Sequence, residues 1–183
     1  MSGPNINIKM TAKTKIHNQE DRRPQIRAFF EKAVINAGVG RASQQAQFAD
    51  KILPQIISDI ATITGQHPQN RPAKKSIAGF KIREGQTVGV RVTLRRDKMA
   101  DFFERFMNIV LPRVKDFQGL KLSCVDHSGT LNIGLKEQYV FIEISGETSP
   151  FSFPLSISFV PKKKNREEAV AKYKELGVPL KKD

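Results

Sequence analysis

The segment TVGVRVTLR, residues 87–95, alternates apolar and polar side chains along its whole length. Because successive side chains of a β-strand point to opposite faces, this pattern predicts a strand with one face in a core and the other face open. The apolar face would carry Val88, Val90, Val92 and Leu94. The open face, which we expect to be basic and hydroxylic, would carry Thr87, Gly89, Arg91, Thr93 and Arg95.

Further strands are predicted on both sides of this segment. Residues 33–37 have strand character, residues 130–135 and 138–144 do as well, and residues 155–160 alternate strictly. These segments are interspersed with helical patterns, without the regular strand–helix–strand repeat of a parallel sheet. We therefore expect an α+β fold, in which an antiparallel-rich sheet has helices packed on one face and leaves the other, basic face free to meet a ligand.

The first predicted helix begins near Ser43, whose hydroxyl can cap it, and ends at Gly65. Its isoleucines recur at helical spacing. Pro54 lies inside this helix, and we expect it to bend the axis because proline removes one hydrogen bond of the helical ladder.

Two more helices are predicted after the alternating strand. The first of them is capped by Asp97, buries its phenylalanines, and is ended by Pro112 and Gly119. The second spans residues 166–176 and has two residues at the spacing of a capping box, Asn165 and Glu168.

The charge of the chain indicates a polyanionic partner. There are 31 Lys and Arg residues against 18 Asp and Glu, which gives a formal net charge of +13. More than half of the excess lies in residues 67–98, where nine side chains are basic and two are acidic. Such an excess opposes compaction by self-repulsion, so it usually reflects a binding partner. We expect nucleic acid first and an anionic membrane surface second.

Several classes of function are disfavoured by what the sequence lacks. The single cysteine, Cys124, has no disulfide partner in the chain, and the three histidines lack the spacing of zinc ligands. No apolar run approaches the roughly 20 residues that cross a bilayer, and we expect no secretory signal. Gly38-Val39-Gly40 begins a phosphate-binding loop that no Gly-Lys pair completes. We therefore expect neither an enzyme nor a cofactor or metal site.

Several motifs together resemble one known family. They are VINAGVG at 34–40, TITGQHP at 62–68, RPAKKSIAGFKIREG at 71–85, GVRVTLR at 89–95, LPRVKDFQG at 111–119, GLKEQ at 134–138 and LGVP at 176–179. In this order they resemble the large-subunit ribosomal proteins numbered five, which bind 5S ribosomal RNA. The resemblance covers about residues 26–180 and is closer to the bacterial form.

The resemblance implies a structural role in the ribosome, in the cytoplasm or in an organelle. Such a protein anchors 5S rRNA in the central protuberance, beside large-subunit rRNA and other 5S-binding ribosomal proteins. The open sheet face and nearby loops would hold this RNA. The residues implied in rRNA binding are Asn36, Gln66, Arg71, Arg91, Thr93 and Arg95.

The resemblance also implies two contacts beyond 5S rRNA. The long loop at residues 73–85 would reach transfer RNA in the peptidyl site. The region of residues 111–119 and the strands after it would bridge to the small-subunit head protein numbered thirteen. The implied transfer-RNA contacts are Lys74, Lys75, Ser76 and Lys81.

Three alternatives stay open at this point. The chain could be a free-standing RNA-binding regulator or an assembly factor on the same fold. Asn36 and Thr93 could serve only strand-edge hydrogen bonds, and Phe80 is expected to pack at the base of its loop rather than to stack on RNA.

We expect residues 1–24 to form a weakly structured extension and residues 25–183 to form a single domain.

Overall fold

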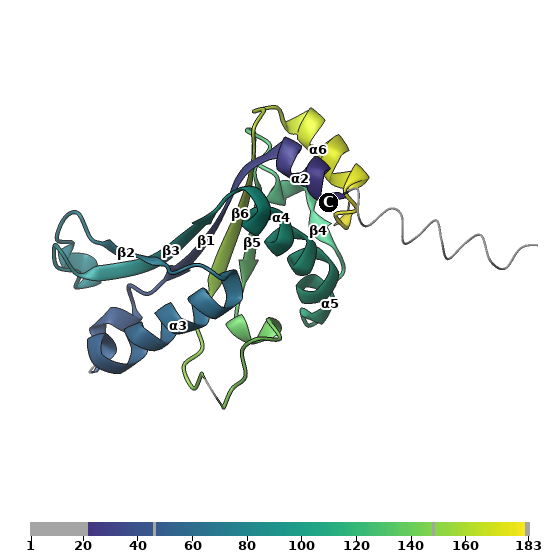
Figure 1. Ribbon diagram of the computed structural model, residues 1–183. Coiled ribbons are helices and arrows are strands. Elements are labelled where there is room, and N and C mark those ends of the chain that lie inside the picture. The colour runs from purple at the N-terminus through teal and green to yellow at the C-terminus, as the bar shows by residue number, and fades with distance from the viewer. Residues whose placement is uncertain (1–21, 46, 148, 182–183) are drawn as a thin grey trace, which may run out of the picture.

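A five-stranded antiparallel sheet forms the centre of the computed structural model, which describes residues 22–45, 47–147 and 149–181. The strand order is β2-β3-β1-β6-β5, and every neighbouring pair is antiparallel (Figure 1). The strands are β1 (Phe30–Gly38), β2 (Gln69–Pro72), β3 (Thr87–Leu94), β5 (Leu131–Leu135) and β6 (Leu155–Pro161). A separate parallel pair joins β4 (Leu120–Lys121) to β7 (Leu180–Lys181).

Helices cover one face of this sheet and close one of its ends. The long helices α3 (Leu53–Thr64) and α4 (Arg96–Arg105) pack on the face that carries the buried valines and leucine of β3. Helices α2 (Arg22–Phe29) and α6 (Arg166–Glu175) lie together where β1 begins and β6 ends (Figure 1). The predicted α+β class, with an antiparallel sheet and helices on one face, is confirmed.

An aromatic cluster fills the space between the sheet and the helices. The ring of Phe159 on β6 lies 5.7 Å from that of Phe30 on β1 and 5.1 Å from that of Phe103 on α4, measured between centroids. Tyr173 of α6 extends the cluster, with its ring 5.9 Å from Phe30. Pairs of this kind add about 0.5–1.5 kcal/mol each beyond the area they bury.

The first predicted helix begins later than expected. Residues Ala42–Gln44 form a separate 3₁₀ turn, and a π-helical turn at Phe48–Ile52 leads into α3, so the prediction that Ser43 caps the helix is wrong. The Ser43 hydroxyl instead donates to the Gly40 carbonyl at 2.8 Å. Pro54 directly follows the π-helical turn, at the start of α3, and the bend expected there stays a prediction. Gly65 ends α3 in the left-handed conformation, as predicted.

The second predicted helix differs at its start. Helix α4 begins at Arg96, and the side chain of Asp97 does not cap it but pairs with Arg27 of α2 at 2.5 Å. The helical path continues through a π-helical turn, Phe106–Val110, into the short α5 (Leu111–Arg113). This path ends at Arg113, one residue after Pro112 and before Gly119, near the predicted stop.

The segment 138–144 is not a strand, contrary to prediction. It contains a 3₁₀ turn, Gln138–Val140, and the Gln138 side chain is fully buried. The Gln138 amide accepts a hydrogen bond from the Phe153 N–H at 3.0 Å and donates to the Phe151 carbonyl at 2.8 Å. The apolar side chains of this segment predicted a strand with backbone hydrogen bonds to a neighbouring strand. The hydrogen bonds of the Gln138 side chain hold the segment instead.

The last helix agrees with its predicted signals. The Asn165 side chain accepts hydrogen bonds from the backbone N–H groups of Glu167 and Glu168, and its amide donates to the Glu168 carboxylate at 3.2 Å. Most of the predicted N-terminal extension, residues 1–21, lies outside the described residues. Residues 22–24 belong to α2. That residues 25–183 form a single domain stays a prediction.

One turn before β5 packs tightly against α6. Gly129 has a φ of +78°, and its carbonyl accepts a hydrogen bond from the Tyr173 hydroxyl at 2.6 Å. Burial raises the pKa of this hydroxyl, because the charged form would lose its hydration. A Cβ at position 129 would lie 2.7 Å from the Cβ of Ala169 and 2.9 Å from the Asn165 carbonyl oxygen.

We predict that Gly129→Ala lowers the free energy of unfolding by about 2–4 kcal/mol, because it adds both a strained φ and a clash with backbone. Urea unfolding followed by circular dichroism measures the change. Gly85→Ala is the matched control, since Gly85 has a φ of +80° but no atom within 4 Å of the added Cβ. Equal losses in the two variants would contradict the role of the α6 contact.

Candidate RNA-binding interface

The sheet face opposite the helices carries a row of polar residues on four of its five strands, and the row ends at a glycine on the fifth. Asn36 on the central strand β1 pairs with Arg91 of β3 on one side and with Ser156 of β6 on the other. Because directly opposed residues of antiparallel strands project to the same side, these side chains share the open face. The register extends the row outward to Gln69 of β2 and Gly134 of β5. We call these five positions the polar row.

A second row runs beside the first. Thr93 of β3 pairs with Val34 of β1, and Val34 pairs with Ser158 of β6. The Ser158 hydroxyl donates to the Asn132 side-chain oxygen on β5 at 2.7 Å. Thr93 and Asn36 are thus on one face, two residues apart in register.

Gln66 lies at the edge of this surface. It follows α3 in the loop that leads to β2, and its side-chain amide donates to the Thr93 carbonyl at 3.3 Å. The Thr64 hydroxyl, which accepts from the Gln66 N–H at 3.3 Å, holds the same turn. The structure therefore brings together the three polar residues that the resemblance implied, from a loop and two strands.

The basic residues are spread more widely than the polar ones. Arg91 lies on the open face, half-buried, and its Nε has no hydrogen-bond partner among the described residues. Arg71 is exposed on β2 beside Gly89, where an added Cβ would meet Arg71 and Asn36 at 3.7 and 3.8 Å. Arg95 does not share the strand with Arg91, because β3 ends at Leu94 and Arg95 precedes α4.

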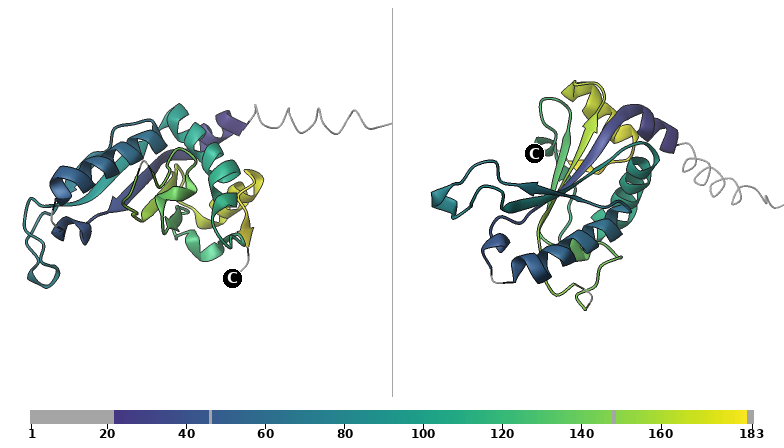
Figure 2. Two further views of the ribbon diagram at one scale, coloured as in Figure 1. Left: turned by 90° about the horizontal axis from the view of Figure 1, so that it is seen from below. Right: turned by 60° about the vertical axis from the view of Figure 1, so that its left-hand side comes forward.

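An arm made of β2, β3 and the loop 73–85 projects from the sheet in all three views (Figures 1 and 2). Ile77 and Ile82 exchange backbone hydrogen bonds of 2.9 and 3.2 Å across the loop. The Ser76 hydroxyl accepts from the Glu84 N–H at 2.9 Å, so it braces the loop from inside. The three lysines implied in transfer-RNA contact, Lys74, Lys75 and Lys81, are all exposed.

Phe80 contradicts its expected packing role. Its side chain is 69% exposed near the tip of the arm, and neighbouring Ile77 is 47% exposed. The Phe80 carbonyl, not its ring, is held, by the side-chain amide of Gln44 at 2.7 Å. An exposed aromatic ring among lysines is the arrangement by which proteins stack on unpaired bases.

Gln86 ties the arm to the body of the protein. Its side-chain oxygen accepts from the Arg83 N–H at 3.0 Å, and its amide donates to the Ser43 hydroxyl at 2.8 Å and to the Ser43 carbonyl at 3.2 Å. One side chain therefore joins the loop to the 3₁₀ turn that precedes α3.

Two family profiles match nearly the whole described chain. One is described as Ribosomal protein L5 and matches residues 27–83, and the other describes the C-terminus of the same ribosomal family and matches residues 87–180. The chain belongs to the ribosomal protein L5 family. Members of this family are structural proteins and not enzymes, which agrees with the prediction from the sequence. The relatives also place the chain on a ribosome, either of the cytoplasm or of an organelle.

Curated relatives of the L5 family cover most of the chain. The large ribosomal subunit protein uL5 of Chlorobium luteolum is 45% identical over 152 residues, which is 83% of this chain and 76% of that protein. The protein of the same name in Fusobacterium nucleatum is 43% identical over 83% of this chain and 81% of its own length. The protein uL5c of Gracilaria tenuistipitata is 44% identical over 81% of each.

The L5-family face contains residues that sequence reasoning did not select. Gln69, Ser156 and Ser158 join the open face through strand register. The alternation of residues 155–160 was a usable signal for the two serines, but it did not say which strand lies beside Asn36. Within the described residues, no cluster of His, Cys, Asp and Glu could hold a metal ion, and no helix is long and apolar enough to cross a bilayer.

We predict that Gln86→Ala loosens the arm but leaves the sheet intact. Hydrogen exchange at the Ile77 and Ile82 amides should become about tenfold faster, because three hydrogen bonds at the base of the arm are lost. Amides of β1 should keep their protection. Gln118→Ala, at an exposed turn, is the control. Unchanged exchange in the arm would show that Gln86 does not hold it.

Proposed function

We propose that this L5-family chain is a structural constituent of the large ribosomal subunit that binds 5S rRNA with its open sheet face and anchors it in the central protuberance. The observation that carries the proposal is the polar row, with Thr93 and Gln66 beside it. It is supported by the names of the relatives, which are large-subunit proteins.

The chemistry of this face suits folded RNA. Neighbouring strands are about 4.8 Å apart, so the four polar side chains of the row present donors and acceptors over roughly 14 Å. A-form RNA offers a wide, shallow minor groove with 2′-hydroxyls and base edges, which amides and hydroxyls can reach. Arg71 and Arg91 add attraction to phosphates, which depends on salt but not on sequence. The other residues proposed to bind rRNA are Asn36, Gln66, Thr93 and Arg95.

A second part of the proposal concerns the arm. With 5S rRNA on the sheet, the arm stays free to reach peptidyl-site transfer RNA through Lys74, Lys75 and Lys81, with Ser76 as a brace. The exposed ring of Phe80 supports contact with RNA. The region of residues 111–119 and the strands after it are proposed to meet the small-subunit head protein numbered thirteen, and other 5S-binding proteins would lie nearby.

A free-standing RNA regulator or assembly factor is the competing function. Sedimentation separates the two, because a constituent stays with mature large subunits whereas an assembly factor is found only in precursor fractions. Binding of the purified chain to 5S rRNA, compared with an unrelated RNA of equal length over a range of salt, tests the specificity. Equal affinities that fall together with salt would indicate only a basic surface.

We predict that Asn36→Ala or Thr93→Ala weakens 5S rRNA binding by about 1–3 kcal/mol, the usual worth of a specific polar contact. Asn70→Ala is the matched control, because Asn70 is exposed on β2 but pairs with Val90, on the other side of the sheet. Filter binding at fixed salt measures the affinities. If neither substitution on the open face changes the affinity, the polar row does not hold 5S rRNA.

Replacing Lys74 and Lys75 together by Ala should spare 5S rRNA binding but weaken the contact of the ribosome with peptidyl-site transfer RNA, because both side chains lie on the arm. Chemical footprinting of transfer RNA on reconstituted subunits measures this contact. Lys164→Ala with Lys174→Ala removes the same charge at the α6 end of the molecule, away from the arm (Figure 1). A collapse of 5S rRNA binding in the arm variant would show that the arm holds 5S rRNA instead.

A further inference from the structure

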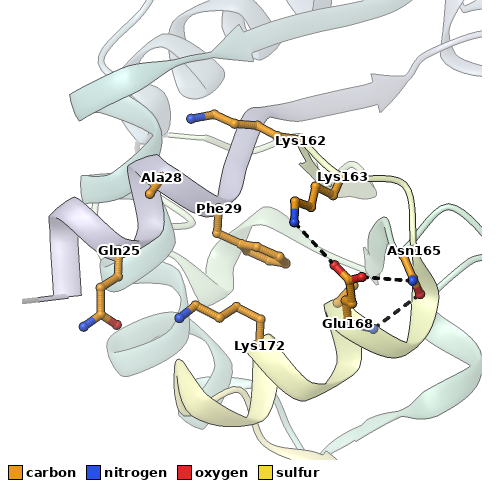
Figure 3. A pocket seen from close by; sticks show the side chains of 9 residues that line it. Gln25, Ala28, Phe29, Lys162, Lys163, Asn165, Glu168 and Lys172 are labelled. Atoms are coloured by element: carbon orange, nitrogen blue, oxygen red, sulfur yellow. Dashed lines mark hydrogen bonds and ion pairs between the residues drawn. The ribbon is translucent and has the colours of Figure 1, made fainter.

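A pocket of about 390 Å³ lies between α2 and α6, at the end of the sheet away from the arm (Figures 1 and 3). Helix α2 and helix α6 form two of its walls, and the turn after β6 forms a third. Its size is at the lower end of the range of roughly 300–1,000 Å³ found for small-ligand sites. The pocket is lined by Gln25, Ala28, Phe29, Lys162, Lys163, Asn165, Glu168, Ala169 and Lys172.

The aromatic ring of Phe29 lies in the middle of the pocket (Figure 3). The core fixes this ring, which meets Phe30 at 4.7 Å and Tyr173 at 5.5 Å, both edge to face. Phe29 is nevertheless only partly buried. The neighbouring Ala28 and Ala169 are small, so space remains open beside the ring.

Three lysines surround this ring. Lys163 lies on one side of it and Lys172 on the other (Figure 3). Lys163 is 3.9 Å from the Glu168 carboxylate, and Lys172 donates to Glu175 at 2.6 Å. Ion pairs at an exposed surface are weak, so both ammonium groups can turn to a stronger anion. Lys162 is held in place because it donates to the Arg27 carbonyl at 2.8 Å.

Glu168, the single carboxylate among the residues that line the pocket, already has partners within the protein. Glu168 accepts from the Asn165 amide at 3.2 Å as part of the α6 cap, and it also faces Lys163. The pocket therefore combines a fixed aromatic ring, room for one planar group, and more positive than negative charge at its rim.

We propose that this pocket takes one unpaired nucleotide of RNA, with the base against Phe29 and the flanking phosphates on Lys163 and Lys172. Stacking on an aromatic ring tolerates any base, and lysines bind phosphate as point charges. This second RNA site rests on the proposed function only in so far as the chain binds RNA. It lies outside the polar row and uses none of its residues.

The surrounding surface favours RNA over an acidic peptide as the occupant. Lys32 pairs with Val160 at the end of the open sheet face next to the pocket, and Lys162 follows two residues after Val160. Basic side chains thus continue from the open face to the pocket, so one RNA molecule can reach both. Acidic peptide motifs are typically bound by clusters of arginine, and no arginine is among the described residues that line this pocket.

The test uses the full chain and a short unpaired RNA oligonucleotide that carries one 2-aminopurine, whose fluorescence falls on stacking. The first variant, Lys163→Gln with Lys172→Gln, removes charge from the rim. Its matched control, Lys164→Gln with Lys174→Gln, removes the same charge from the same turn and helix outside the pocket lining. We expect the rim variant to weaken binding about fivefold more than the control does.

Two further variants test the ring and the space beside it. The ring test is made in a chain that already carries Phe80→Leu, because the exposed Phe80 ring is a second stacking surface. In that background Phe29→Leu keeps an apolar floor and should abolish the remaining fluorescence change. Because this substitution touches the core, Ala28→Leu is the second variant. Ala28 is exposed on α2, so a leucine there fills the pocket without disturbing the fold. We expect Ala28→Leu to weaken binding of the oligonucleotide about as much as the rim variant does.

Each remaining outcome overturns the proposal. Equal weakening in the rim variant and its control would mean that only net charge matters, and unchanged fluorescence in wild type would mean that no base stacks. Displacement of the oligonucleotide by polyglutamate at equal charge would assign the pocket to acidic peptides. The proposed binding of 5S rRNA by the open sheet face is tested separately. Asn36→Ala and Thr93→Ala should weaken 5S rRNA binding and should leave binding of the short oligonucleotide unchanged.

Discussion

The packing of Phe159 against four other aromatic rings is the contact on which the rest of the structure depends. This residue lies on β6 and meets Phe30 of β1 as well as Phe102, Phe103 and Phe106 of α4 and its π-helical continuation. The rings join the two central strands to the helical layer. The helices cover only one face of the sheet, so within the described residues the other face stays open.

The open face is the surface on which the proposed contact with 5S rRNA rests. Its polar row is built by register, since Asn36, Arg91 and Ser156 come from three strands that are far apart in the sequence. The covered face supplies rigidity, so the amides and hydroxyls of the open face are presented in fixed positions. A preorganised surface loses little side-chain entropy on binding, which favours affinity. The arm adds reach without disturbing the sheet, because Gln86 anchors its base.

Polar contacts between distant segments hold the parts of the chain that lack regular structure. The Ser149 hydroxyl donates to the buried Asp59 carboxylate of α3 at 2.5 Å, and Gln138 donates to the same hydroxyl at 3.1 Å. Helix α2 is held to α4 in a different way, by a ladder in which Arg23 pairs with Glu104 at 3.1 Å. The hydrogen bond to Glu104 raises the pKa of Arg23. The same docking of α2 places Phe29 at the pocket beside α6.

Local pattern was sufficient for the strands β1, β3, β5 and β6, for the stop at Gly65 and for the Asn165 cap, because each depends on neighbours within a few residues. The motifs alone also indicated the family. Tertiary structure decided which residues share the open face, that Phe80 is exposed, and that the segment 138–144 is irregular. The physical reason is that strand register and buried hydrogen bonds join residues far apart in the chain, and their energies appear only once the whole core has formed.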